Sequence, residues 1–300
     1  MPKRKSSENE ALIKRDRALI NSALRRYLGT AEGPAILLRA MRYAVLSGGK
    51  RLRPILTMES ARALGGDVKS MLPFACAMEL VHNFSLVHDD LPAMDNDDTR
   101  RGKPTCHKRF GEGLAILVGC GLFNLAFGII SKAKTKQSLK AISLLSDAIG
   151  ARGMIGGQAL ELASRDSAKR ARPLKDKIDT MKTAAIMAAS CEMGAVLAGG
   201  KKENVRKICG YGKNLGRAFQ IADDIADGRP SGRAFEEMRV KVKFFISKAK
   251  KEIKSLGKRS RALDYIADSV LCHCERPKGA KQSHTKRLLR RPFRPPRNDS

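Results

Sequence analysis

Apolar residues recur every three or four positions through long stretches of the chain, and few windows alternate strictly between apolar and polar residues. The first spacing is typical of amphipathic helices, whereas strict alternation is typical of half-buried strands. The pattern therefore predicts an all-α fold. The predicted helices span residues 8–28, 34–47, 71–90, 111–131, 138–151, 153–165, 176–198, 203–227 and 234–256.

Proline and glycine positions support several of these boundaries. Pro34 stands at the start of one predicted helix, and the pair Gly48-Gly49 follows its end. Pro73 lies in the first turn of another, and Pro92 follows that helix. Proline fits the first helical turn because its missing N–H has no partner there, and glycine is common just past the last turn. Both helices are therefore bounded on each side.

No internal repeat and no Gly/Ser-rich linker divides residues 1–271, so we predict one domain over that range. The character of the chain changes at Cys272. Residues 272–300 contain nine Lys or Arg, two acidic residues and four prolines, and they lack an apolar stripe. We predict that this basic tail is disordered.

The chain carries 59 Lys and Arg against 30 Asp and Glu, which gives a net charge of +29. Such a surface attracts polyanions, whether nucleic acid, an anionic membrane or a phosphorylated small molecule. A basic helical nucleic-acid-binding protein is one alternative. The chain has no Trp and only 5% aromatic residues, so it lacks the usual residues for base stacking, and we expect no nucleic-acid partner.

The sequence also bears on the compartment. No run of eighteen or more apolar residues is present, and the charged N-terminus precedes no apolar stretch. Seven cysteines, an odd number set mostly among small apolar residues, fit reduced thiols. We therefore expect a cytoplasmic protein without a membrane anchor.

Acidic residues are clustered. Eight of the 17 aspartates fall in two short windows, DDLPAMDNDD and DDIAD. Clustered carboxylates repel each other unless cations lie between them, and Mg²⁺ prefers oxygen ligands. We interpret both windows as metal-binding; a solvated acidic turn is the plainer alternative. The residues concerned are Asp89, Asp90, Asp95, Asp97, Asp98, Asp223, Asp224 and Asp227.

Basic residues gather beside the first window. GGKRLRP places Lys50, Arg51 and Arg53 just after two glycines, and Arg100 and Arg101 follow the aspartates directly. Glycine permits a close backbone approach, and guanidinium groups bind phosphate oxygens in pairs. A solvated loop is the alternative for either cluster alone. Together, the acidic and basic clusters indicate a site for a substrate with two or more phosphates.

Five segments occur in the order found in one enzyme family: GGKRLRP, HNFSLVHDDLPAMDNDDTRRGKPTCHKRFGE, GMIGGQALEL, MKTAAIM and FQIADDIAD. Over residues 30–228 the chain resembles the short-chain trans-isoprenyl (polyprenyl) diphosphate synthases, above all the bacterial farnesyl type. The resemblance implies an all-α homodimer, an isoprenoid-synthase helical bundle around a central cavity. It also implies that the two Asp-rich motifs face each other across the mouth of that cavity.

The implied activity is that of a Mg²⁺-dependent prenyltransferase. It condenses isopentenyl diphosphate with dimethylallyl or geranyl diphosphate and gives farnesyl diphosphate and diphosphate. A C–O bond breaks to leave an allylic cation, so metal ions and basic residues must neutralise the leaving diphosphate. The second diphosphate must be held separately, with its double bond facing the reacting carbon.

The resemblance assigns roles by matching position. The first metal-binding motif matches Asp89, Asp90 and Asp95. The second matches Asp223, Asp224 and Asp227, and the family holds three Mg²⁺ ions between the two motifs. The isopentenyl diphosphate ligands match Lys50, Arg53, His82 and Arg101. The allylic side matches Arg100 and Lys182, which contact diphosphate, and Thr183 and Gln220, which lie along the developing cation.

Phe84 is the candidate for setting product length. It lies five residues before Asp89, about 7.5 Å along a helix axis, where a bulky ring can stop a growing chain. Together with the Pro-Ala insertion inside DDLPAMD, the resemblance implies a C15 product. Core packing is the alternative for Phe84, and a geranylgeranyl-type product is the alternative for the enzyme.

The chain departs from the family pattern after Asp227, where a loop that normally closes over diphosphate and supplies a lysine is shortened. Arg229 and Arg233 are the candidate replacements. The pattern resumes with the terminal helix RALDYIADSV, and the tail from Cys272 resembles a translated repeat or a frame-shifted extension. We expect turnover to suffer more than binding. An inactive relative and a terpene cyclase are the enzymatic alternatives, although a cyclase has no need of GGKRLRP.

Overall fold

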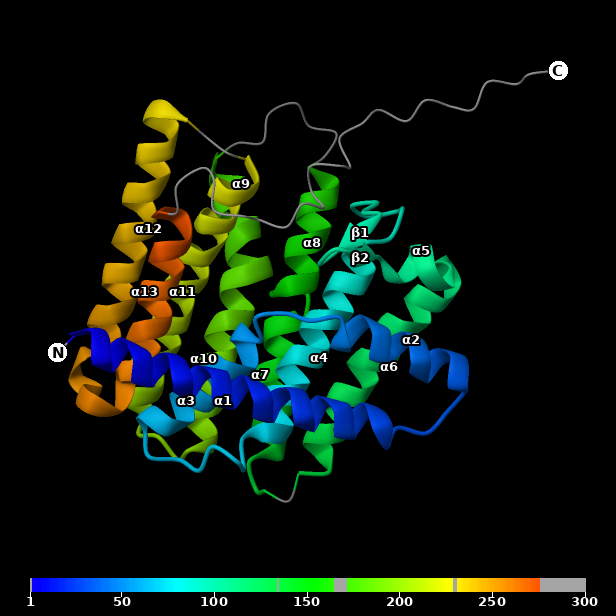
Figure 1. Cartoon of the computed structure of the whole chain (residues 1–300), viewed down its shortest axis with the longest axis horizontal. Coiled ribbons are helices and arrows are strands. Elements are labelled where there is room, and N and C mark those ends of the chain that lie inside the picture. The colour runs from blue at the N-terminus through cyan, green and yellow to red at the C-terminus, as the bar shows by residue number, and fades with distance from the viewer. Residues whose placement is uncertain (1, 134, 165–171, 229–230, 276–300) are drawn as a thin grey trace.

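The structure is a computed structural model that describes residues 2–133, 135–164, 172–228 and 231–275. Within these ranges the side chains of residues 2–6, 172–173, 227 and 273–275 are outside the description. Helices make up almost all of the described chain, with a single two-stranded hairpin (Figure 1). The prediction of an all-α fold is confirmed.

The helices pack side by side, and α1 runs across the others (Figure 1). The two strands pair antiparallel, with Thr99 opposite Pro104. The elements in chain order are α1 (Pro2–Gly29), α2 (Ala35–Leu46), α3 (Leu52–Ala63), α4 (Leu72–Asp89), β1 (Thr99–Arg100), β2 (Lys103–Pro104), α5 (Cys106–Phe110), α6 (Glu112–Ser131), α7 (Ser138–Ile149), α8 (Met154–Ala163), α9 (Arg172–Asp179), η1 (Thr180–Ala184), α10 (Ala185–Leu197), α11 (Lys202–Gly228), α12 (Gly232–Ile253), η2 (Lys254–Ser260) and α13 (Arg261–Glu275).

Helix α3 lies in the centre of the bundle and is absent from the prediction. Nearly all of its side chains are buried, including the polar Thr57, Glu59 and Ser60. A helix buried on every side has no apolar stripe, so the periodicity gives no signal. Helix α10 approaches α3 so closely that a Cβ on Gly194 would lie 2.0 Å from the Thr57 carbonyl oxygen.

The turn between α2 and α3 is built around a buried arginine. Arg51 adopts a left-handed backbone conformation (φ 54°). Its Nη1 donates to Glu79 Oε1 on α4 at 2.7 Å, and its Nε donates to Asn21 Oδ1 on α1 at 2.9 Å. Both side chains of the Arg51–Glu79 ion pair are 2% exposed. Arg51 is therefore a structural residue, and the interpretation of all of GGKRLRP as a phosphate-binding cluster is wrong for this position.

Three further differences concern helix boundaries. The helix predicted over 176–198 is interrupted by the π-helical turn η1, a feature that is frequent at functional sites. Helix α11 ends at Gly228 and α12 begins at Gly232, so the connection after the second Asp window is short. Helix α13 continues to Glu275, so the prediction that disorder begins at Cys272 is wrong for residues 272–275. The rest of the tail, 276–300, lies outside the described residues.

Helix α6 is the most apolar helix in the chain. Within the described residues, it alone is long and apolar enough to span a membrane by length and composition. One side of α6 packs against α4, α2 and α7. Another side exposes Ile116 and Leu117, which are 47% and 56% accessible.

Candidate active site

The first Asp window begins at the carboxyl end of α4. Asp89 is the last residue of the helix, Asp90 follows it, and Asp95 lies exposed in the next loop. The Asp95 backbone N–H donates to the Asp89 carbonyl oxygen at 2.9 Å, which folds the loop back onto the helix end. A helix C-terminus carries partial negative charge, so carboxylates placed there favour a bound cation.

The surroundings of Asp89 shift the pKa of its carboxyl group. Burial raises the pKa of Asp89 to about 6; the Lys182 ammonium opposes this shift, and the Asp95 carboxylate adds to it. Asp95 and Lys182 are therefore both close enough to act on Asp89, although Lys182 lies 93 positions later in the chain than Asp89. At neutral pH the Asp89 carboxylate is charged and can bind a cation.

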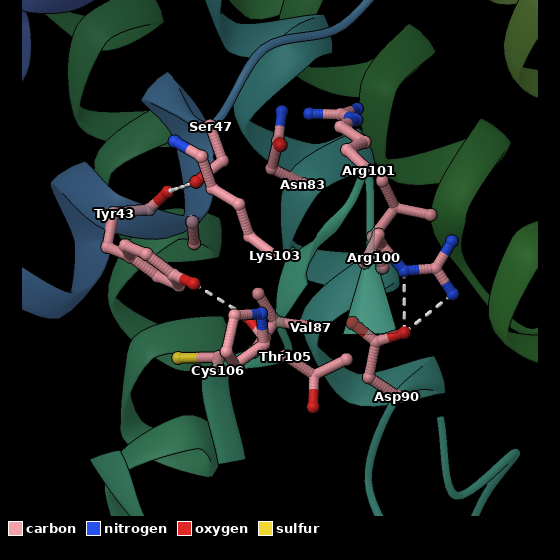
Figure 2. A pocket seen from close by; sticks show the side chains of 13 residues that line it. Tyr43, Ser47, Asn83, Val87, Asp90, Arg100, Arg101, Lys103, Thr105 and Cys106 are labelled. Atoms are coloured by element: carbon pink, nitrogen blue, oxygen red, sulfur yellow. Dashed lines mark hydrogen bonds and ion pairs between the residues drawn. The ribbon is translucent and has the colours of Figure 1, made fainter. Parts of the chain in front are cut away.

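Other aspartates of this window already have basic partners. Arg100 Nε donates to Asp90 Oδ1 at 2.6 Å, and Figure 2 shows the two side chains facing each other. Arg100 also reaches Asp97 at 3.2 Å, and Lys108 pairs with Asp98 at 2.8 Å. Arg100 thus pairs with two aspartates of the first window.

The hairpin turn brings a second arginine to the glycine pair. Arg101 has a left-handed backbone (φ 54°), and Arg101 and Arg100 point in different directions (Figure 2). Arg101 Nη1 donates to the Gly48 carbonyl oxygen. A Cβ on Gly49 would lie 3.0 Å from the Arg101 guanidinium carbon, and Gly49 itself has φ +137°. The two glycines therefore let Arg101 lie flat against the turn that precedes α3.

Lys50 and Arg53 complete the basic group on this turn. Lys50 is exposed, and its Nζ lies 5.6 Å from the centre of the Phe219 ring on α11. Arg53 is half-buried in the first turn of α3, and its buried Nε has no hydrogen-bond partner among the described residues. Burial lowers the pKa of Arg53 to about 10, while the charges of Glu79 and Asp223 oppose this shift. Arg53 thus lies within electrostatic reach of the second Asp window.

His82 lies on α4 inside this basic group. Burial lowers the pKa of His82 well below its usual range, and the nearby charges of Arg53, Arg101 and Arg100 add to the shift. The imidazole is therefore neutral at physiological pH and offers one N–H donor and one acceptor. His82 thus lies within electrostatic reach of Arg53 and Arg101.

The second Asp window lies near the carboxyl end of α11. Its side chains take part in a chain of hydrogen bonds that reaches the π-helical turn. Thr183 Oγ1 donates to Gln220 Oε1 at 2.8 Å, and Gln220 Nε2 donates to Asp224 Oδ1 at 3.0 Å. Asp223 lies beside Asp224 on the helix, and the backbone of Asp227 lies one turn further, with its side chain outside the description.

Two polar residues near this series of hydrogen bonds were not predicted as site residues. Glu161 on α8 accepts a hydrogen bond from Lys182 Nζ. Gln158, one turn earlier on the same helix, has its side-chain amide nitrogen and oxygen buried without a hydrogen-bond partner in the part of the chain that the structure describes. Both lie in the GMIGGQALEL segment, whose place in the motif order is the one sequence signal that marks them.

Aromatic rings pack beneath the first Asp window. The Phe84 ring meets the His88 ring edge-on at 4.9 Å and the Phe123 ring on α6 at 5.3 Å. Phe123 in turn contacts Phe127 at 5.0 Å. Phe84 is half-buried, so one part of its ring is packed and another part is accessible.

A narrow pocket lies between α2, α4 and the hairpin (Figure 2). Its volume is about 40 Å³, room for a few water molecules. The lining includes Tyr43, Asp90, Arg100, Arg101 and Lys103. Tyr43 Oη donates to the Pro104 carbonyl oxygen at 2.7 Å, which fixes the hairpin against α2. The Tyr43 hydrogen bond therefore helps to hold the hairpin and its two arginines in position. The pocket itself is too small for a diphosphate substrate.

Among the described residues, the carboxylates of the two Asp windows do not form a complete metal site on their own. In the part of the chain that the structure describes, no three Asp, Glu, His or Cys side chains converge as a ready metal site. Mg²⁺ usually binds one or two carboxylates and completes its shell with phosphate oxygens and water. The carboxylates form two separate groups at helix C-termini, and basic side chains lie near both groups. This arrangement suits a metal ion that binds together with a diphosphate.

Comparisons with known proteins agree with this arrangement. Residues 34–234 match the family model for polyprenyl synthetases. Farnesyl diphosphate synthase of Geobacillus stearothermophilus is 37% identical over 287 residues, which cover 87% of this chain and 96% of that protein. Dimethylallyltranstransferase of Fischerella ambigua is 37% identical over 268 residues, which cover 81% of this chain and 77% of that protein.

Solved structures show the same similarity. An FPP/GFPP synthase from Zymomonas mobilis superposes with a TM-score of 0.83 at 33% identity, over 89% of this chain and 99% of that one. A geranyltransferase from Legionella pneumophila superposes with a TM-score of 0.83 at 31% identity, over 89% and 98% of the two chains. The matched family model spans both Asp windows and the basic turn between α2 and α3, and the chain belongs to the polyprenyl synthetase family.

Proposed function

We propose that this chain is a Mg²⁺-dependent prenyltransferase that joins isopentenyl diphosphate to dimethylallyl or geranyl diphosphate and forms farnesyl diphosphate. One observation carries the proposal. Each Asp window has a basic side chain within electrostatic reach, because Lys182 acts on Asp89 and Arg53 lies within reach of Asp223. Alternating carboxylates and cations of this kind suit two diphosphates and the metal ions that accompany them.

The allylic diphosphate occupies the side between the two Asp windows. When bound, Mg²⁺ supplies positive charge that neutralises the leaving diphosphate. Arg100 and Lys182 add fixed positive charge to the same group, and they are already held by Asp90 and Glu161. The proposed ligands of three Mg²⁺ ions are Asp89, Asp90, Asp95, Asp223, Asp224 and Asp227.

Polar oxygens line the path of the allylic carbon. Thr183 donates its hydroxyl hydrogen to Gln220, so the lone pairs of the Thr183 oxygen remain available. These lone pairs stabilise positive charge as the C–O bond breaks and the electron pair leaves with diphosphate. The double bond of isopentenyl diphosphate then attacks the allylic carbon, and the proton that is lost passes to the released diphosphate.

Isopentenyl diphosphate binds to the basic group at the turn before α3. Lys50, Arg53 and Arg101 surround its diphosphate, and the neutral His82 adds a hydrogen bond without a further charge. Arg53 is the residue best prepared for this role, because its buried Nε has no partner in the described part of the chain. A bound phosphate oxygen supplies that partner.

Incorporation of labelled isopentenyl diphosphate tests the proposal. The protein is incubated with Mg²⁺ and with dimethylallyl, geranyl or farnesyl diphosphate in turn, and EDTA replaces Mg²⁺ in the control. We expect label in a C15 diphosphate with the first two primers and none with EDTA. A C20 product from farnesyl diphosphate would shift the assignment to the geranylgeranyl type, and no label with any primer would contradict the proposal.

We expect Phe84→Ala to lengthen the product beyond C15, because it removes the ring that stops the chain beneath the first Asp window. Phe84→Tyr keeps a ring at this place and should keep the C15 product. Loss of a fully buried Phe costs about 3–5 kcal/mol, and we expect a smaller cost at the half-buried Phe84, so the thermal unfolding of both variants is measured alongside. A folded Phe84→Ala variant with an unchanged product would assign Phe84 to core packing alone.

We further propose a homodimer in which the exposed apolar side of α6 is covered by a second copy of the chain. Leu117→Lys should then shift the protein toward a monomer, because it places a charge in an apolar interface. The control is Val240→Lys on α12. Val240 is 63% exposed, and α12 lies on the opposite side of the bundle from α6 (Figure 1). Light scattering after size exclusion gives the mass. A monomeric wild-type protein, or equal masses for both variants and the wild type, would contradict the proposed interface.

A further inference from the structure

The carboxylate of Asp224 already has a donor at each oxygen. Gln220 Nε2 donates to Oδ1 at 3.0 Å, and Lys175 Nζ donates to Oδ2 at 2.7 Å. Lys175 belongs to α9 and lies outside all five sequence segments that carry the family resemblance. It lies 49 positions before Asp224 in the chain. A basic side chain thus lies against the second Asp window.

Lys175 has a second partner on its own helix. Its Nζ lies 2.9 Å from Asp179 Oδ2, one helical turn further along α9. Burial lowers the pKa of Lys175, but the hydrogen bonds to Asp224 and Asp179 outweigh burial and raise it, so the ammonium stays charged. The Lys175 side chain is 49% exposed, so it has room to leave Asp224 and keep Asp179 as its partner.

A metal ion at Asp224 and the ammonium at 2.7 Å from the same carboxylate carry charges of the same sign. Each therefore lowers the affinity of the carboxylate for the other. A diphosphate that arrives with the metal brings negative charge and offsets the repulsion. A free metal ion brings no such compensation.

We infer that Lys175 is a resident counter-ion of the second Asp window, which holds Asp224 until a metal arrives with a diphosphate and weakens the binding of metal alone. This inference rests on the proposed function. It makes Lys175 a positioning residue, since it acts on the site through Asp224. No part of it requires Lys175 to touch substrate.

The test is a titration with Mn²⁺, followed by the paramagnetic resonance signal of the free ion. The background variant is Asp89→Asn combined with Asp95→Asn, so that the second Asp window dominates the binding. Lys175→Gln in this background should bind Mn²⁺ about three- to tenfold more tightly, the range expected for a partly exposed ion pair plus the removal of a like charge. Lys175→Arg keeps the charge and should stay within about twofold of the background.

Lys177→Gln is the matched control. Lys177 is exposed on the same helix, and its substitution changes the net charge equally. Equal Mn²⁺ affinities for Lys175→Gln and Lys177→Gln would overturn the inference. The titration is repeated on the wild-type protein with geranyl thiodiphosphate, an analogue that releases its diphosphate slowly. Absence of protein-bound Mn²⁺ with this analogue would overturn the proposed function itself.

Discussion

Asp89→Ala and Asp223→Ala should each reduce kcat by about 10²–10³-fold, the effect of removing one stabilising group from a transition state in which charge develops. Each substitution removes a carboxylate proposed to hold metal against the leaving diphosphate. Asp89 provides the clearer test of the two, since burial and the nearby Asp95 carboxylate already favour a cation beside it. Initial rates with geranyl and isopentenyl diphosphate at saturating Mg²⁺ provide the measurement.

Asp98→Ala is the control within the same loop. Asp98 is exposed and pairs with Lys108, so its loss should change kcat by less than about threefold, as for an ordinary exposed ion pair. Wild-type rates in both Asp89→Ala and Asp223→Ala would end the proposal that these residues hold the metal. A large loss in Asp98→Ala as well would mean that the loop, rather than a particular carboxylate, determines the rate.

The largest effect on stability is expected at Arg51. Arg51→Met leaves the buried Glu79 carboxylate without its ion pair, which costs about 3–5 kcal/mol of unfolding free energy. The double variant with Glu79→Met removes both charges and should recover most of that loss, because two apolar groups replace a buried pair at little cost. Urea denaturation of the wild type, both single variants and the double variant completes the cycle.

Arg53→Met serves as the comparison on the same turn. Burial already lowers the pKa of Arg53, so its charge is held at some cost in the folded protein. We expect its replacement to leave the unfolding free energy unchanged or slightly raised, while binding of isopentenyl diphosphate weakens. If Arg51→Met costs no more than Arg53→Met, the buried pair does not stabilise the turn as described.

Helix positions followed well from the sequence where one side of a helix is apolar and another polar. The all-α fold and the family were predicted correctly on these grounds and on the order of the motifs. Helix α3 was missed because it is buried all round, and the π-helical turn was missed because residues 180–184 carry no breaker. The spacing of apolar residues reveals a helix only when one side of it is buried and another is exposed. Neither the fully buried α3 nor the π-helical turn changes that spacing in a regular way.

The clustering of basic residues in the sequence predicted only part of the candidate site. Lys50, Arg51 and Arg53 are neighbours in the chain, yet Arg51 points into the core and pairs with Glu79, whereas Lys50 is exposed. Charge and spacing alone do not distinguish these residues. The difference comes from the partners that the fold offers: Arg51 has a left-handed backbone, and its guanidinium reaches Glu79 and Asn21 on neighbouring helices.

Contacts between distant segments were beyond prediction. Lys175 reaches Asp224 across 49 positions, and Lys182 pairs with Glu161 across 21. A single lysine on an exposed helix carries no signal of its partner, since surface helices commonly bear lysines. The π-helical turn packs against α8, α9 and α11, and α9 packs against α8, which brings the partners of these pairs together.

Release of diphosphate from geranyl diphosphate tests the central claim most directly. It is measured with Mg²⁺ in the presence and in the absence of isopentenyl diphosphate. We expect release only when isopentenyl diphosphate is present, with one diphosphate set free for each molecule consumed, and at a lower rate than in relatives with a longer loop after the second Asp window. Equal release without isopentenyl diphosphate would indicate a cyclase or a hydrolase, and no release with both substrates bound would identify an inactive relative; either result would contradict the account.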